Sequence, residues 1–288
     1  MTQPDQLIPS ASQKIFKRRK IMKKSPKENT IDNAIRKHLS GLALQAAEII
    51  FKDPEVHAFQ EHANTVSIKR LGYNDHGPVH MRKAALNAII LAKLLVESGV
   101  ELSLVKDNSG TTEDSLVAIT VSTLLHDLGM SIARDSHEMY SITLAMPIIE
   151  RILKELYPDK IDKQVIVKAT IIECIAGHMA TRRIHSIEAG CVLIGDGCDM
   201  EKGRARIPTL IKSAPQIGDI HRYSASAIDK LRIRKGKDKP IRINVEMSES
   251  VGFFQIEEVL FPKIKFSPIK QYIELIAGVK DEDPVRYL

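Results

Sequence analysis

Residues 115–129 read SLVAITVSTLLHDLG and predict the central helix of the protein. Ser115–Leu125 is apolar on nearly every face of a helix, which is typical of a helix at the centre of a helical domain. His126 and Asp127 follow at its end, directly before Leu128-Gly129. A capping aspartate and a hydrogen-bonded core histidine explain this dipeptide when it is taken alone.

Helical periodicity extends from this stretch toward both ends of the chain. Apolar residues recur at helical spacing in five further segments: Ile31–Phe51, His80–Val96, His137–Leu156, Val165–Ile175 and Ile187–Met200. Ser186 directly precedes the last of these segments and is suited to cap its start. These segments predict a helical domain over residues 31–210.

The pattern changes near residue 219. Ile228–Ile233 and Ile241–Met247 read as strands around a Lys-Gly-Lys-Asp-Lys-Pro turn, Phe253–Phe261 is helix-like, and Tyr272–Ile276 alternates again. The fold class expected is therefore mainly α, with a small α+β domain over residues 219–288. This domain carries no chemical motif, and we expect it to pair subunits as a homodimer or to cover the site.

The positive charge lies almost entirely in the first thirty residues. The chain of 288 residues has a net charge of +6, and residues 1–30 hold eight basic residues against two acidic ones: Lys14, Lys17, Arg18, Arg19, Lys20, Lys23, Lys24 and Lys27 against Asp5 and Glu28. This composition predicts a disordered basic tail. Such a tail is either solvated without a partner or contacts RNA, DNA or another acidic surface through phosphate charge.

The remaining composition restricts the class of protein. No apolar run is long enough to span a membrane, and the first twenty residues lack the apolar block of a secretory signal, so we expect a cytoplasmic protein without a membrane partner. The three cysteines, Cys174, Cys191 and Cys198, show no CxxC spacing. This argues against a disulfide framework and against a thiolate zinc site.

Ionisable residues fall on helix faces that are otherwise apolar, where a polar side chain needs a partner. His80 heads a stripe with Ala84, Ala88 and Leu91, and Asp196 shares a face with Val192. His137 heads a similar stripe, His178 ends an apolar helix, and Asp199 lies one turn after Asp196. His137 and His178, each taken alone, are best explained as hydrogen-bonded core or cap residues.

Together these residues point to a metal. A helical core would otherwise have to satisfy four imidazoles and at least two carboxylates, and no Lys or Arg is evident among their neighbours. Imidazole and carboxylate without thiolate suit Mn²⁺, Fe²⁺, Mg²⁺ or Zn²⁺, and residues at helix ends leave room for an open coordination position. We therefore expect one or two divalent ions as cofactor. A metal with an open coordination position is what hydrolysis of a phosphate ester needs.

The order His80, then His126-Asp127, then Asp196 resembles the motif set of the HD-domain superfamily of metal-dependent phosphohydrolases. The segment 124–129 resembles the HD segment of that family, and Gly195-Asp196 with Cys198-Asp199 resembles the helix that supplies its last aspartate. The resemblance covers roughly residues 70–206. It implies a helical fold in which these four residues bind a metal. His137 and His178 fall where members with a second metal carry further histidines.

The sequence departs from the branch of this family that acts on cyclic dinucleotides. It has no Gly-Tyr-Pro element, and Met179 rather than a second histidine follows His178. His185 is expected at the surface, and His76 in a loop or behind the ligands. The segments 72–80 and 199–206 are more similar to a group of HD proteins of archaea and some bacteria. Hydrolysis of cyclic di-GMP is therefore not implied.

The resulting hypothesis is a phosphomonoesterase or phosphodiesterase for a nucleotide-type substrate. Asp127 would bridge the metals or orient the attacking water, and Lys83, Arg204 and Arg206 would contact phosphate. For these three cations, a solvated helix end is the alternative. The alternative for the whole protein is a metal-stabilised nucleic-acid-binding or regulatory module without turnover, in which the basic tail engages RNA.

Overall fold

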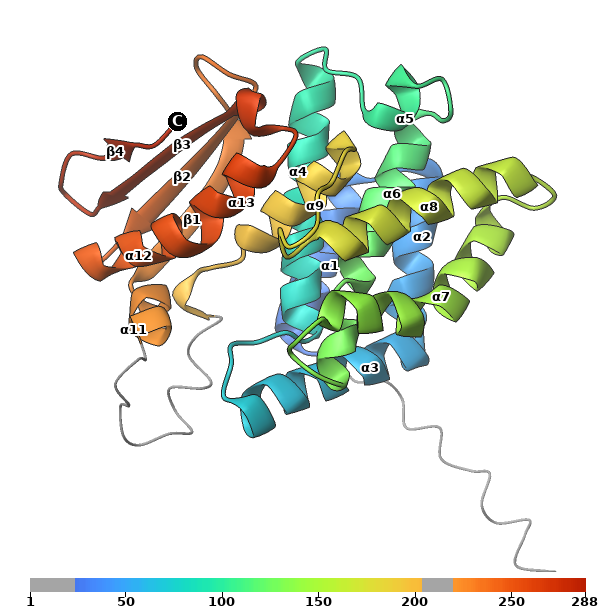
Figure 1. Cartoon of the computed structure of the whole chain (residues 1–288), viewed down its shortest axis with the longest axis horizontal. Coiled ribbons are helices and arrows are strands. Elements are labelled where there is room, and N and C mark those ends of the chain that lie inside the picture. Colours follow the sequence, from blue (N-terminus) through green and yellow to red (C-terminus); the bar gives the residue numbers. More distant parts are fainter. Residues whose placement is uncertain (1–23, 204–219) are drawn as a thin grey trace, which may run out of the picture.

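The computed structural model describes residues 24–203 and 220–288 of the chain. A body of helices is followed by a small sheet with its own helices, so the prediction of a mainly α fold with a C-terminal α+β part is confirmed (Figure 1). The helical body consists of α1 (Pro26–His38), α2 (Gly41–Lys52), α3 (Pro54–Thr65), the π-helical segment η2 (Val66–Leu71), α4 (Pro78–Glu97), α5 (Ser103–Lys106), α6 (Thr112–Leu125), the 3-10 turn η3 (Leu128–Ser131), α7 (His137–Leu156), α8 (Ile161–Gly177) and α9 (Ile187–Gly197).

Helix α6 is the central helix, as its sequence predicts. All residues from 117 to 125 are buried, and the helix packs against α2, α4, α8 and α9. Its start is fixed by a capping box, in which Thr111 accepts from the backbone of Asp114 and the Asp114 carboxylate accepts from the backbone of Thr111. Because α6 is anchored at its start and packed on all sides, the residues at its end have a fixed position in the core.

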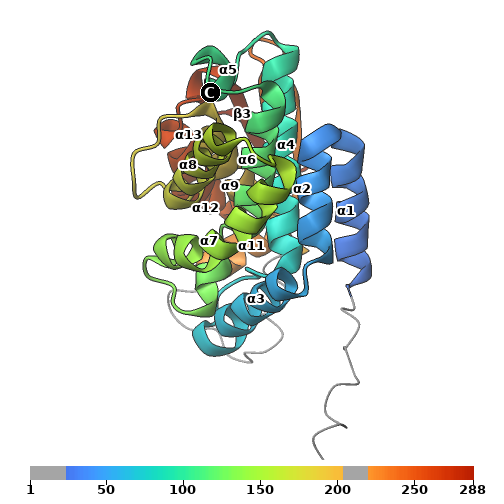
Figure 2. The same cartoon turned by 90° about the vertical axis from the view of Figure 1, so that its right-hand side faces the viewer.

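The N-terminal segment differs from the prediction in two respects. The periodic stretch Ile31–Phe51 forms two helices, because the chain is extended at Leu39 and Ser40 and Gly41 adopts a φ of 54°, which favours glycine. Helix α1 begins at Pro26, inside the segment predicted as a disordered tail, and Ser25 and Glu28 form its capping box. Residues 1–23 of that predicted tail lie outside the described residues. Figure 2 shows α1 and α2 side by side at one edge of the helical body.

The C-terminal part contains α11 (Ile220–Ser226), β1 (Ile228–Lys235), β2 (Ile241–Met247), η4 (Ser250–Gly252), α12 (Phe253–Gln255), η5 (Ile256–Leu260), α13 (Phe261–Phe266), η6 (Lys270–Tyr272), β3 (Ile273–Val279) and β4 (Val285–Arg286). The sheet order is β1-β2-β3-β4. Strand β2 pairs antiparallel with β1 and parallel with β3, and the helices between β2 and β3 form the crossover that a parallel pair requires. The short β4, antiparallel to β3, was not predicted.

The sheet part is joined to the helical body at two helices. Strand β1 packs against α4, and α13 packs against α9 (Figure 1). Alternate residues of β2 share one face of the sheet and are buried: Ile241, Ile243, Val245 and Met247. None of the helices within 24–203 and 220–288 is long and apolar enough to cross a membrane.

Candidate metal centre

Gly129 allows the start of α7 to lie against the turn that follows α6. A β-carbon at this position would come within 2.0 Å of the His137 carbonyl oxygen and 2.6 Å of the Ser141 backbone nitrogen. Only glycine permits that approach. As a result, His137 Nε2 lies 3.2 Å from Asp127 Oδ1.

Gly195 has the same function between α9 and α4. A β-carbon there would come within 2.7 Å of the Ala88 backbone nitrogen and 2.8 Å of the Ala88 β-carbon. The two helices therefore pack at close range, and Asp196 Oδ1 lies 3.2 Å from His80 Nε2. The glycines of the Leu-Gly and Gly-Asp pairs thus bring ligands from separate helices together.

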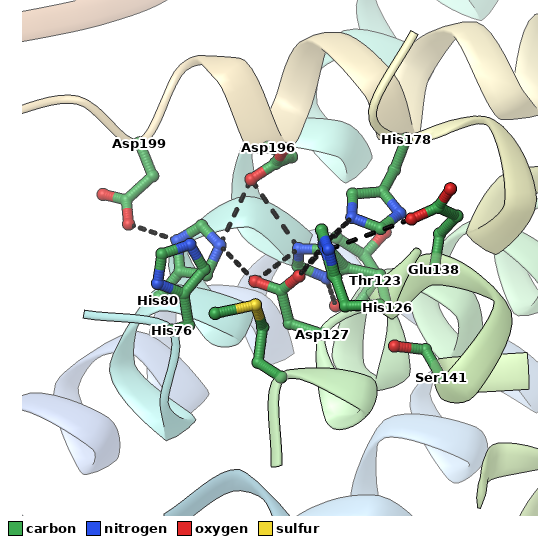
Figure 3. Close-up of polar contacts among 12 residues, drawn as sticks. His76, His80, Thr123, His126, Asp127, Glu138, Ser141, His178, Asp196 and Asp199 are labelled. Carbon is green, nitrogen blue, oxygen red and sulfur yellow. Dashed lines mark hydrogen bonds and ion pairs between the residues drawn. The ribbon is translucent and has the colours of Figure 1, made fainter. Parts of the chain in front are cut away.

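The side chains converge on Asp127 in two groups (Figure 3). His80 Nε2 and His126 Nε2 lie 3.2 and 3.3 Å from Asp127 Oδ2. On the other side, His137 Nε2 and His178 Nε2 lie 3.2 and 3.4 Å from Asp127 Oδ1 and 3.0 Å from each other. One carboxylate oxygen therefore faces each pair of imidazoles.

The second nitrogen of every one of these imidazoles is held by an acceptor. Nδ1 of His80 lies 2.7 Å from Asp199 Oδ2. Nδ1 of the other three histidines lies 2.7–2.8 Å from a backbone carbonyl oxygen: His126 from that of Thr123, His137 from that of Arg134, and His178 from that of Ile175. Carbonyl oxygens only accept, so these Nδ1 atoms carry the proton. In the neutral imidazole the lone pair is then on Nε2, directed at Asp127.

Lone pairs that face a carboxylate and one another require either a proton or a metal cation between them. Nε2 of His126 is fully buried and has no hydrogen-bond partner among the residues that the structure describes. The other candidate ligand atoms are nearly as inaccessible, since the four histidines are at most 1% exposed. Asp127 and Asp196 are exposed by 2% and 6%. Histidines that ligate metals have this arrangement, with the distal nitrogen donating to a carbonyl or carboxylate.

The pKa values reflect the same crowding of acceptors. Burial lowers the pKa of His126, but the Asp127 and Asp196 carboxylates outweigh it and raise the pKa to about 9. Burial lowers the pKa of His178 to about 4, and the nearby imidazoles of His126 and His137 act in the same direction. Burial opposes ionisation of Asp127, yet the surrounding imidazoles hold its pKa well below the usual range. Without a metal, a proton on His126 supplies the missing positive charge.

These residues form two groups that could each hold a metal ion. In one group His80, His126 and Asp127, and in the other Asp127, His137 and His178, have ligand atoms within 4.8 Å of one another. Asp127 belongs to both groups and could therefore serve a metal ion in either. The ligands are nitrogen and oxygen atoms without sulfur, a set that suits a divalent metal.

The predicted site residues differ in where they lie and in whether the structure describes them. All six predicted metal ligands lie in this one buried cluster, and their binding of metal stays a prediction: His80, His126, Asp127, His137, His178 and Asp196. Lys83 is partly exposed, with Nζ 3.7 Å from Glu201 Oε2. Arg204 and Arg206 lie outside the described residues. His76 is buried in the loop before α4, and its ring centroid is 5.6 Å from that of His80.

Sequence reasoning missed Lys263, which corrects the expectation that no buried cation lies near the ligands. This residue of α13 is 9% exposed; its ammonium group forms an ion pair with Asp196 Oδ2 and donates to the His178 carbonyl oxygen at 2.9 Å. The available signal was periodicity, because Ile256, Leu260 and Lys263 are spaced to share one helix face. The C-terminal part, predicted to carry no chemistry, therefore reaches the cluster.

Arg134 is a second cation near the cluster that the sequence did not single out. Its carbonyl oxygen holds His137, while its guanidinium group lies 5.5 Å from the centre of the Tyr73 ring and 3.9 Å from Met130 Sδ. No ion pair of Arg134 is found among the described residues. A guanidinium group without an acidic partner, on the loop that positions a ligand, is available for an anion.

Comparison with known proteins gives one relative. The chain is 41% identical over 247 residues to the uncharacterized protein MJ1020 of Methanocaldococcus jannaschii, a match that covers 86% of this chain and 93% of the relative. No protein-family model matches the chain, and no solved structure matches it significantly. The name of this relative states no activity.

Proposed function

The chain belongs to the family of the uncharacterized M. jannaschii protein, and we propose that it acts as an HD-type metal-dependent phosphohydrolase. The observation that carries this proposal is the convergence of four imidazole Nε2 atoms on the two oxygens of Asp127 in a buried cluster. The order of the ligands along the chain, His80, His126-Asp127 and Asp196, supports the HD assignment. A divalent metal in such a cluster lowers the pKa of water and neutralises charge on a phosphoryl oxygen.

The residues of the chain have separable tasks in this proposal. Asp127 offers one oxygen to each group and so fixes the distance between the two positions. The carbonyl oxygens behind the imidazoles and the Asp199 carboxylate keep the Nε2 atoms directed inward. Burial excludes water from the ligand atoms, which strengthens their interaction with a cation.

The substrate is proposed to be a phosphate monoester or diester of nucleotide type. Arg134 is a suitable phosphate contact because its guanidinium group has no acidic partner among the described residues and sits on the loop between Asp127 and His137. Lys83, Arg204 and Arg206 remain proposed contacts on the strength of their position in the sequence. Tyr73, beneath the Arg134 guanidinium group, is 45% exposed and offers a ring face to a base.

The test combines metal analysis with hydrolysis. Elemental analysis of the purified protein should find one or two divalent ions per chain, and Mn²⁺ should support hydrolysis of bis-p-nitrophenyl phosphate, p-nitrophenyl phosphate or a nucleotide in a panel. Asp127→Ala should lower turnover by roughly 10²–10³-fold or more, the scale on which single central groups act. The matched control is Asp135→Ala, because Asp135 lies outside the cluster on the loop before α7 and should be neutral.

Two results would contradict the proposal. A wild-type protein without bound metal or turnover would remove the site, and an Asp127→Ala variant as active as wild type would remove its central residue. Tightly bound metal without turnover on any substrate, together with salt-sensitive binding of RNA that is lost on deleting residues 1–23, would instead support the structural-metal, nucleic-acid-binding alternative.

A further inference from the structure

The C-terminal part of the chain contributes one charged group to the metal centre. Lys263 Nζ is paired with Oδ2 of Asp196, while Oδ1 of the same carboxylate lies 3.2 Å from His80 Nε2 and 3.6 Å from His126 Nε2. The two oxygens of Asp196 therefore have different partners. One faces the ligand cluster, and the other faces a cation from a different part of the fold.

The surroundings of Lys263 are shaped for this contact. Gly197 on α9 leaves space for the aliphatic part of the side chain, since a β-carbon there would lie 3.0 Å from Lys263 Cδ. The ammonium group is held from a second direction by the His178 carbonyl oxygen at 2.9 Å. His178 belongs to the group of Asp127, His137 and His178, whereas Asp196 lies against His80 and His126 of the other group, so Lys263 links the surroundings of both.

We propose that Lys263 is a positioning residue that restricts Asp196 to one-oxygen ligation and couples the metal centre to the docking of the C-terminal part. The inference rests on the proposed metal centre. With Oδ2 paired to the ammonium group, Oδ1 is the oxygen that Asp196 would offer to a metal. Without the C-terminal part, this restriction is lost.

The direction of the effect on metal binding follows from two opposing influences of Lys263. The residue orders a single carboxylate, which favours binding slightly, but its positive charge would also repel a divalent ion held by the same carboxylate. In a buried site of low effective dielectric the repulsion outweighs the ordering, so removal of the charge should tighten metal binding by roughly tenfold or more. Turnover should fall at the same time, because Asp196 becomes free to ligate through both oxygens.

The experiment compares Lys263→Met with Lys265→Met in the full chain. Both residues lie on α13, but Lys265 is exposed, and its Nζ lies 4.1 Å from the centre of the Phe261 ring. The dissociation constant of Mn²⁺ is measured by calorimetry on metal-free protein, without substrate. Tighter binding and slower turnover in Lys263→Met alone would support the inference. Binding equal to or weaker than that of Lys265→Met would overturn it.

The result is distinguishable from failure of the proposed function. If wild type binds Mn²⁺ and Lys263→Met resembles the control, the inference fails and the metal centre stands. If wild type binds no metal, both fall. Because Lys263→Met leaves Oδ2 of the buried Asp196 carboxylate without its cation, the metal-free variant should be less stable, and Lys263→Met/Asp196→Asn should regain stability. A double variant that is less stable than both single variants would also contradict the pairing.

Discussion

Two buried polar clusters lie near the start of α4, around residues only two positions apart, and they are built in opposite ways. Arg82 donates to Asp32 Oδ1 at 2.7 Å, to Gln60 Oε1 at 3.0 Å and to the Pro78 carbonyl oxygen at 3.1 Å. His80, two residues earlier, faces Asp127 and Asp196 with an Nε2 atom whose neighbours are acceptors.

The difference shows how a structural cluster can be separated from a ligand site by physics alone. Around Arg82 the donors meet acceptors, because its guanidinium group donates to Asp32 Oδ1 and Gln60 Oε1 while the Lys24 ammonium group pairs with Asp32 Oδ2. Around His80 the acceptors meet acceptors, so the cluster is complete only with protons or a metal. Burial is nearly the same in both, since Arg82 is 2% and His80 1% exposed. Burial therefore does not distinguish them, whereas the matching of donors and acceptors does.

The largest effect on stability is expected from the cluster around Arg82. Arg82→Met leaves Asp32 Oδ1 and Gln60 Oε1 buried without their donor, which should lower the free energy of unfolding by about 3–5 kcal/mol. The loss should be the same with and without Mn²⁺, because Arg82 contacts none of the metal ligands. Urea denaturation measures it, with Arg36→Met as control: the Arg36 side chain is 38% exposed beside Glu48 and should cost about 1 kcal/mol or less. If Mn²⁺ restored the stability of Arg82→Met, the distinction between the Arg82 cluster and the ligand cluster would be wrong.

The ligand cluster should respond to metal rather than to loss of a partner. We expect wild type to bind two ions, His126→Ala or His178→Ala to bind one, and Asp127→Ala to bind neither, because only Asp127 belongs to both groups. Metal at about 100 times its dissociation constant should stabilise wild type by about 2.7 kcal/mol per site. Elemental analysis and thermal unfolding give both quantities. His185→Ala, an exposed histidine, is the control, and equal metal content in His178→Ala and His185→Ala would refute the second group.

The sequence predicted those parts of the fold that depend on local pattern. The bounds of α7 match the predicted His137–Leu156, and Ser186 caps α9 by accepting from the Ala189 backbone nitrogen. The apolar stripe that His80 heads predicted that this residue faces inward. The HD resemblance identified candidate ligands that are far apart in the chain. Periodicity and motif order were sufficient for these features.

The parts that the sequence did not reveal depend on contacts between distant segments. Lys263 meets a carboxylate 67 residues earlier, and Arg82 meets one 50 residues earlier. Nothing local separates Lys263 from Lys265, or Arg82 from Lys83, except the helix face on which each lies. The break between α1 and α2 likewise depends on Glu113, whose carboxylate accepts from the Leu42 backbone nitrogen.

The pH dependence of the metal-free protein tests the ligand cluster through its protons. His126 has a pKa raised to about 9, so its contribution to stability is complete below the unfolded value of about 6.5 and is lost as pH rises through 9. His178 has a pKa lowered to about 4, so stability is lost as pH falls from 6.5 toward 4. Stability of the metal-free protein should therefore be greatest near pH 6.5, with slopes up to about 1.4 kcal/mol per pH unit on either side. Calorimetry across this range with a chelator present measures it, and a flat profile would contradict the arrangement.

The smallest effect is expected from Lys83, which follows Arg82 directly yet belongs to neither cluster. Its ammonium group is partly exposed and lies 3.7 Å from Glu201, so Lys83→Met should change the free energy of unfolding by less than about 1 kcal/mol and leave the metal content unchanged. If Lys83 contacts phosphate as proposed, KM should rise severalfold with little change in kcat, because an exposed charge binds ground state and transition state about equally. Lys93→Met, on the same helix and bonded to the His38 carbonyl oxygen, is the control. An unchanged KM in steady-state kinetics would show that Lys83 does not contact phosphate. Arg134 would then remain as a proposed phosphate contact among the residues that the structure describes.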